Sequence, residues 1–271
     1  MVGYLQPVND TPIDMAVMYT VLRRSQFFAR CIGLTSVDCV FDQACYAKAL
    51  QVIWSLLREF ADISCRLGVF HTVSVMIAAL FKMFGDAGLV DVITESTIVA
   101  CGSLNGVITG HHYYRAVRTL KIVYEAFSRL HFKSFHIFLE EKHELDIELD
   151  LIHDKIVALR TSFSADDTQV FLNSDSFKKL HEYLVEFRSA DHGPMFHFWT
   201  SFLQMVELLL NFIHASREGD WHLHLSCIRE MLPWFLAYDQ VNCSRYGAYY
   251  FCSMQPCKFC KIATHRSMRH M

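Results

Sequence analysis

The sequence predicts an α+β fold that is predominantly α-helical, in which a small partial sheet is covered and followed by a large helical region. Two observations predict the sheet, because residues 37–42 and 63–70 are short runs rich in β-branched, aromatic and other apolar side chains. A third observation predicts the helical region: from Asp91 onward, apolar residues recur mainly at helical spacing. An acidic residue, Asp42, and a histidine, His71, stand where the two strands give way to helices.

The composition is typical of a packed globular chain. Of 271 residues, 52% are apolar and 20% are charged, which is ample for a core. The formal net charge is only -3, so a contact with nucleic acid would have to be local. The ten cysteines are mostly isolated and the N-terminus has no signal-peptide pattern, so we expect an intracellular protein with reduced thiols.

No membrane span is expected from the uncharged runs. The longest of them, residues 68–81, is cut off by Lys82 and is shorter than the roughly 20 residues of a spanning helix.

The first half of the chain shows three helices around the two strands. Thr11 and Pro12 are typical of a helix start, and this helix is expected to end near Gly33. A second helix should follow Asp42, and a third, with an apolar stripe from residue 69, should end at Gly85.

A long helix is expected over about residues 112–139, after three glycines that break the chain. Its apolar stripe leaves four basic side chains largely on another face, namely Arg115, Arg118, Lys121 and Arg129. This basic face is the candidate nucleic-acid-binding surface, because Lys and Arg contact phosphates.

Residues 140–160 reverse the charge and predict a solvated acidic helix. Turn-rich residues at 161–176 mark the candidate boundary, giving segments 1–160, 161–250 and a basic Cys/His tail at 251–271. The helix at 195–213 is apolar on nearly every side and is expected to be buried, and Pro233 is expected to kink or end the helix that follows.

Five ordered motifs carry a resemblance to a known family. They are FDQACYAKA, RLGVFHT, FGDAGLVDVITES, GSLNGVITGHHYYRAVRTLKIVYEAFSRL and REGDWHLHLSCIREMLPWFLAYDQVNCSRY, which together cover about residues 37–250. The chain resembles mobile-element-associated animal proteins that are similar to Mutator-type transposases with an RNase H-like core. The resemblance implies that the predicted strands belong to a partial RNase H-like sheet.

The resemblance also implies metal-dependent cutting and joining of DNA. Such folds use three carboxylates to hold two Mg²⁺ or Mn²⁺ ions about 4 Å apart. Asp42 takes the position of a strand-end carboxylate, and Glu230, with Glu95 as the alternative, is the candidate for the third. Only some forty residues precede Asp42, which leaves no room for the strand that carries the first carboxylate, so we expect a fragment or decayed copy that is inactive alone.

Two further readings of these residues stay open. Asp42 could instead cap the helix that follows it by accepting a backbone N–H. In the related transposases a cysteine stands three residues before the histidine, whereas here Gly68 precedes His71, which weakens the case for a metal at His71.

The tail has the spacing of a retroviral-type zinc knuckle. Its candidate Zn²⁺ ligands are Cys257, Cys260, His265 and His270, because thiolate and imidazole suit tetrahedral zinc. The alternative is an unstructured basic tail. His222 and His224 are two residues apart on a predicted helix and so should face different sides, which argues against a shared metal.

The expected function is that of a transposable-element-derived protein, related to DNA-cutting transposases and inactive alone. The alternative is a non-catalytic helical binding or scaffold protein. DNA is the expected partner, and the nucleus is the candidate compartment within the cell.

Overall fold

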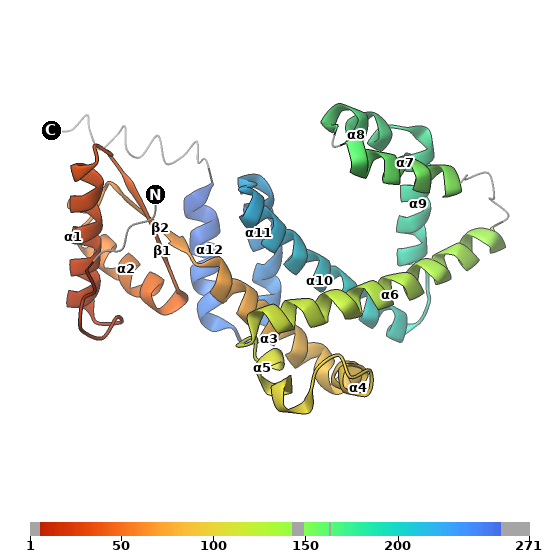
Figure 1. The fold of residues 1–271 in the computed structure, drawn as a ribbon, viewed down its shortest axis with the longest axis horizontal. Coiled ribbons are helices and arrows are strands. Elements are labelled where there is room, and N and C mark those ends of the chain that lie inside the picture. Colours follow the sequence, from red (N-terminus) through yellow and green to blue (C-terminus); the bar gives the residue numbers. More distant parts are fainter. Residues whose placement is uncertain (1–5, 143–148, 163, 256–271) are drawn as a thin grey trace. The chain divides into compact units, whose positions relative to one another are not determined.

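The computed structural model describes residues 6–142, 149–162 and 164–255, and in this part of the chain it is an α+β fold dominated by helices (Figure 1). The predicted fold class is confirmed. The elements in chain order are α1 Met15–Cys31, β1 Val37–Phe41, α2 Gln43–Ser55, β2 Ile63–Leu67, α3 Val69–Phe84, the π-helical turn η1 Gly85–Leu89, α4 Val90–Glu95, the 3-10 turn η2 Cys101–Ser103, α5 Leu104–Ile108, α6 Tyr113–Glu141, α7 Leu149–Ser162, α8 Ala165–Leu172, α9 Asp175–Ser189, α10 Pro194–Glu218, α11 Trp221–Ala237 and α12 Val241–Met254.

The chain divides into two compact units. Unit 1 comprises Met1–Thr119 and Glu207–Met271, and unit 2 comprises Leu120–Val206. The candidate boundary at 161–176, between the expected segments 1–160 and 161–250, lies inside unit 2.

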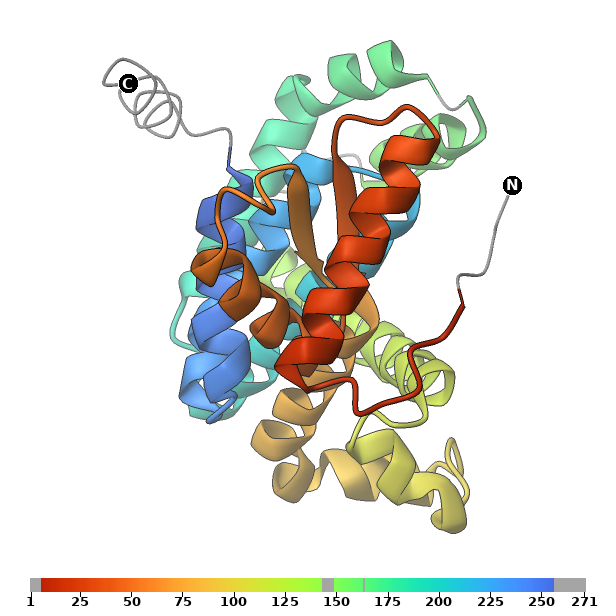
Figure 2. The ribbon, with the colours of Figure 1, turned by 90° about the vertical axis from the view of Figure 1, so that its left-hand side faces the viewer.

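The sheet of unit 1 is a single parallel pair of strands joined through α2, and it is the whole sheet of the described residues. Phe41 lies beside Leu67, so the carboxyl ends of both strands meet at one edge. α1 contacts β1 and α12 contacts β2, and both views show the strand pair between these helices (Figures 1 and 2). One β-α-β unit is present, and the RNase H-like assignment stays a prediction.

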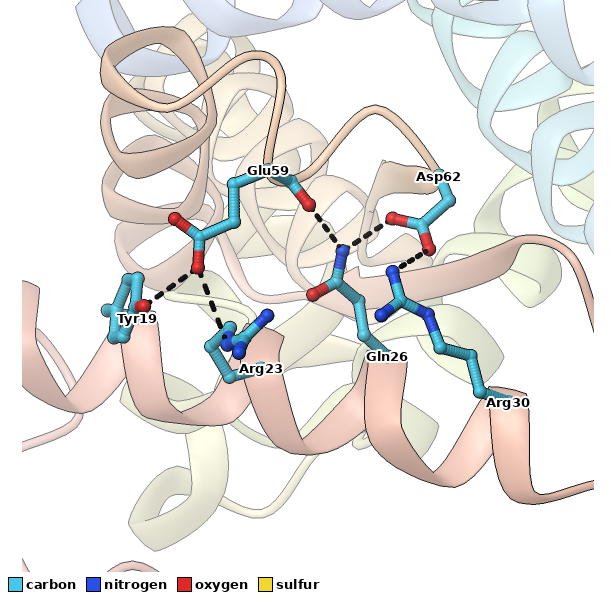
Figure 3. A network of polar contacts seen from close by, with 6 residues as sticks. All are labelled: Tyr19, Arg23, Gln26, Arg30, Glu59 and Asp62. Atoms are coloured by element: carbon cyan, nitrogen blue, oxygen red, sulfur yellow. Dashed lines mark hydrogen bonds and ion pairs between the residues drawn. The ribbon is translucent and has the colours of Figure 1, made fainter.

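Polar contacts attach α1 to the loop between α2 and β2 (Figure 3). Gln26, only 1% exposed, donates from Nε2 to the backbone carbonyl of Glu59 at 2.7 Å and to the carboxylate of Asp62. Arg30 pairs with Asp62 at 3.1 Å, and Arg23 pairs with Glu59 at 3.4 Å. The helix starts later than expected, because Asp14, not Thr11, is its N-cap and accepts the N–H of Ala16.

α3 is a core helix of unit 1, and it ends at Gly85 as predicted. Its buried residues include Val73, Met76, Ile77 and Leu80, which follow the 3.6-residue stripe of the sequence.

The stretch Val69–Glu95 is long and apolar enough to cross a membrane by length and composition, with a mean hydropathy of 1.7. The apolar run was expected to be cut off at Lys82, but α3 continues past this lysine to Phe84. Half of the most apolar window is buried within the fold, as in the core helix of a folded domain, and Gly88, with φ of 108°, interrupts the regular helix. The expected absence of a membrane partner stays a prediction.

Two helices of the C-terminal half differ from expectation. α10 is not buried on every side, because Phe202, Met205 and Leu209 are buried whereas Gln204 and Asn211 are exposed. α11 continues through Pro233 to Ala237, so this proline does not end the helix.

Unit 2 has its own aromatic cluster. Phe135, Leu139 and Phe187 are buried together, and Phe138 and Phe196 pack against them. Of the predicted acidic helix at 140–160, the structure describes the end of α6 at Glu141 and the helix α7 from Leu149, and residues 143–148 lie outside the described residues.

Candidate functional site

Asp42 and His71 lie at the carboxyl edge of the strand pair, one after each strand. The Asp42 carboxylate is the N-cap of α2 and accepts the backbone N–H of Cys45 at 2.8 Å. His71 Nε2 contacts Gln43 Oε1 at 2.7 Å. Burial lowers the pKa of His71, and the nearby Asp42 charge acts in the opposite direction. The observed contact of Asp42 is therefore the one expected if Asp42 caps the helix that follows it.

No three-ligand metal site is formed by these side chains. Within residues 6–142, 149–162 and 164–255, no three His, Cys, Asp or Glu side chains gather closely enough to hold a metal ion. Glu230 is exposed on α11 and lies 3.5 Å from Arg229, and Glu95 is exposed at the end of α4. The structure brings Asp42 and His71 to one edge but adds neither Glu230 nor Glu95 to them as a third ligand.

Close packing against Phe41 explains why residue 68 is a glycine. Its N–H donates to the carbonyl of Phe41 at 2.7 Å, and an added Cβ would lie 2.9 Å from that oxygen. A cysteine at this position would push β2 and β1 apart at their carboxyl ends, so the strand closure seen here needs glycine.

The four basic candidates of α6 are all exposed. Arg115 donates to the hydroxyl of Ser103 at 2.7 Å, and Arg129 pairs with Glu125 at 2.6 Å. Glu125 lies on the same helical face as Arg118 and Arg129, so this face is mixed in charge, and its role in binding stays a prediction. The candidate zinc ligands Cys257, Cys260, His265 and His270 lie outside the described residues.

A cavity of unit 1 opens beside the same strand pair. It has a volume of about 510 Å³ and is lined from β1 and β2 by Val40, Arg66 and Leu67. The end of α10 and the helices α11 and α12 supply Ser216, Trp221, His224 and Tyr250. In sheets of parallel strands, ligands characteristically bind near the carboxyl ends of the strands.

A chain of hydrogen bonds fixes the floor of this cavity. Ser216 Oγ donates to the carbonyl of Phe212 at 2.8 Å and so accepts from His224 Nδ1 at 3.1 Å. His224 Nε2 then carries the lone pair and accepts the Tyr250 hydroxyl at 3.2 Å. Burial, with Arg66 nearby, lowers the pKa of His224 to about 4, and burial raises the pKa of Tyr250 to about 12. Both side chains are therefore neutral at pH 7.

Among the described residues that line the cavity, Arg66 is the one with a cationic side chain. Its guanidinium carbon lies 4.8 Å from the centre of the Trp221 ring, and Nη2 donates to Asp38 at 2.6 Å. Its Nε is buried and has no hydrogen-bond partner among the described residues. Trp221 in turn stacks on His224, with the ring planes 9° apart and the centres 5.3 Å apart. The cavity is thus lined by a guanidinium that lies next to an aromatic face and has one buried, unpaired donor.

Sequence reasoning missed this site. It considered His222 and His224 only as a metal pair, and the structure agrees that they face different sides, because His222 is exposed and His224 is buried. One signal was available: Arg66 is a charged residue inside a short buried strand, where a charge needs a partner. Its ion-pair partner is Asp38 on β1, but Trp221, whose ring lies against the guanidinium, is more than 150 positions away in the sequence, and no local pattern links Arg66 to Trp221.

The comparisons with known proteins give a family without an assigned activity. No curated protein and no solved structure matches the chain. A family model described as "Domain of unknown function (DUF8702)" matches residues 1–268. The chain therefore belongs to the DUF8702 family.

Proposed function

We propose that this chain is a transposable-element-derived protein that binds DNA and does not cut or join it by itself. The motif resemblance supports the origin. The proposal depends on one observation: the cavity beside the strand pair holds an unpaired guanidinium donor of Arg66 next to the ring of Trp221.

This pair of side chains suits a single DNA strand. A guanidinium donates to phosphate oxygens, and an aromatic ring stacks on a base of any sequence. The cavity volume of about 510 Å³ lies within the usual range of ligand sites, roughly 300–1,000 Å³. The Arg66 side chain is 38% exposed, so its guanidinium can contact a phosphate of a bound DNA strand.

The contacts of Asp42 support the absence of catalysis. Two-metal cutting of DNA needs carboxylates that converge on two ions about 4 Å apart. Asp42 instead caps α2, and neither Glu230 nor Glu95 joins Asp42 and His71 in a group of three ligands. Mg²⁺ or Mn²⁺ would then bind too weakly to support the reaction.

The test is a binding titration of a fluorescently labelled single-stranded oligonucleotide by the purified chain, followed by fluorescence anisotropy at several salt concentrations. We expect Arg66→Gln to lower the affinity by about tenfold, the scale of one lost stacking or charge-assisted contact. Arg245→Gln is the matched control, because Arg245 also lies over an aromatic ring, Tyr246, but does not line the cavity. Absence of binding, or equal losses in the two variants, would reject the site.

A non-catalytic scaffold that binds another copy of the chain is the second candidate. It is favoured by large apolar side chains that are exposed at and after the end of α1: Phe27 at 62%, Ile32 at 74% and Leu34 at 51%. Light scattering during size-exclusion chromatography should show a dimer that Ile32→Ser dissociates. A monomer at every concentration would exclude this candidate.

A further inference from the structure

A second cavity lies within unit 2, and it differs in character from the cavity beside the strands. It has a volume of about 400 Å³ and is formed by α6 and α10. Its wall is mainly apolar and includes the aromatic rings of Phe127, Phe196 and Trp199, and Leu130 and Met195 are 62% and 63% exposed. An apolar wall of this size is typical of sites for small molecules.

Two polar atoms in the wall have no hydrogen-bond partner among the described residues. They are Oγ1 of Thr200, a side chain only 8% exposed, and Nε2 of His131. The neighbouring Ser201 donates back to the carbonyl of His197 at 2.9 Å, as a helical hydroxyl usually does, and Thr200 does not. Leaving such atoms unpaired inside a protein is unfavourable, so native structures usually supply them with a partner.

The rings around His131 hold its side chain in place. Phe196 stacks on it at 5.3 Å between ring centres, with the planes 20° apart, and Phe187 meets it edge-on at 5.1 Å. Burial lowers the pKa of His131, and the nearby Arg188 and His192 act in the same direction. The imidazole is therefore neutral near pH 7 and can either accept or donate one hydrogen bond at Nε2.

We infer that this cavity binds an uncharged, largely apolar ring compound that carries a hydroxyl or carbonyl oxygen as the partner of Thr200 Oγ1 and His131 Nε2. The aromatic wall contacts the ring. His131 lies on α6 and Thr200 on α10, so an oxygen that pairs with both atoms would link the two helices. An anion finds no charged partner among the described side chains that line this cavity.

Three related probes test the inference by isothermal titration calorimetry on the full chain. They are 1-naphthol, naphthalene and 1-naphthoate, which share the ring and differ in the oxygen group. We expect 1-naphthol to bind about fivefold to tenfold more tightly than naphthalene, the scale of one net hydrogen bond, and 1-naphthoate to bind most weakly.

Thr200→Val separates binding from folding, because valine keeps the branched shape and loses only the hydroxyl. This variant should lose the preference for 1-naphthol, keep its affinity for naphthalene, and be at least as stable as the wild type, because an unpaired buried hydroxyl is removed. Thr72→Val is the matched control: Thr72 is 1% exposed and donates to the carbonyl of Gly68, so its loss should lower stability and leave 1-naphthol affinity unchanged.

Three outcomes would overturn the inference. These are no binding of either neutral probe, equal affinities of the wild type for 1-naphthol and naphthalene, and a Thr200→Val variant with undiminished affinity for 1-naphthol. Retained naphthalene binding in the variant shows that the cavity is still formed.

Discussion

At the scale of single residues, His224 shows how a buried imidazole is kept neutral. Both of its nitrogens are occupied, by Ser216 and by Tyr250, and Arg66 and Trp221 face it from β2 and from its own helix. A proton added to Nε2 would displace the Tyr250 hydroxyl and create a second positive charge near Arg66. The network therefore stabilises the fold only while His224 is unprotonated.

This network predicts a loss of stability in mild acid. The pKa of His224 is about 4 in the folded chain and about 6.5 in the unfolded chain, so the unfolded state takes up the proton first. The contribution of His224 to the free energy of unfolding is complete above about pH 6.5 and falls by about 3 kcal/mol as the pH drops to about 4. Urea unfolding at pH 7 and pH 4.5 measures this loss of stability. The free energy of unfolding of His224→Gln should differ less between the two pH values than that of His222→Gln. His222→Gln is the control because His222 is exposed.

Asp42 gives a prediction that separates a capping role from a metal ligand. Asparagine caps a helix about as well as aspartate, whereas alanine does not. If Asp42 acts as the N-cap of α2, Asp42→Asn should leave the unfolding free energy within about 0.5 kcal/mol of the wild type, and Asp42→Ala should lower it by about 1 kcal/mol. Mn²⁺ that raises the melting temperature of the wild type, and not of Asp42→Asn, would identify a metal site instead.

At the scale of elements, the junction between β2 and α3 depends on Gly68. A methyl group at this position would meet the carbonyl of Phe41 at 2.9 Å. We expect Gly68→Ala to lower the unfolding free energy by about 1–3 kcal/mol, as overpacking does. Gly102→Ala is the control, because a Cβ there meets nothing within 4 Å and the backbone φ is not positive. Equal effects of the two substitutions would show that the strands adjust without cost.

The attachment of α1 depends on Gln26 more than on the ion pairs around it. Gln26→Met removes the donor to Glu59 and Asp62 inside the fold and should cost about 1–2 kcal/mol. Arg23→Met removes a half-exposed pair with Glu59 and should cost less than about 1 kcal/mol. Denaturant midpoints of the two variants compare them directly, and the reverse order would contradict the burial argument.

The local elements could be predicted because their signals are local. The two strands, the helix after Asp42 and the end of α3 at Gly85 follow from periodicity, a cap and a glycine. α10 could not be predicted in the same way, because its composition is apolar on nearly every side while Gln204 and Asn211 are exposed. Pro233 was expected to kink or end α11, and it does not end it, because the helix continues to Ala237.

At the scale of the whole molecule, the sequence located one edge of the candidate site and missed the rest. Asp42 was expected at the end of a strand and directly follows β1, whereas the strand expected to reach residue 70 ends at Leu67, so His71 lies in the first turn of α3. Arg66, Trp221 and Tyr250 come from distant segments, and only the packing of α11 and α12 in unit 1 brings them together. The two unpaired polar atoms of the unit 2 cavity, Thr200 Oγ1 and His131 Nε2, could not be predicted either, because a missing hydrogen bond leaves no pattern in a sequence.

The measurement that tests the proposed function most directly is one incubation of labelled single-stranded DNA with the purified chain in Mg²⁺ or Mn²⁺, divided between a native and a denaturing gel. We expect a shifted complex on the native gel that is weaker for Arg66→Gln, and an uncut strand of the original length on the denaturing gel. Shortened or joined strands that disappear with Asp42→Asn would show a working metal-dependent enzyme and contradict the claim of binding without cutting. Absence of any shifted complex would contradict the claim of DNA binding.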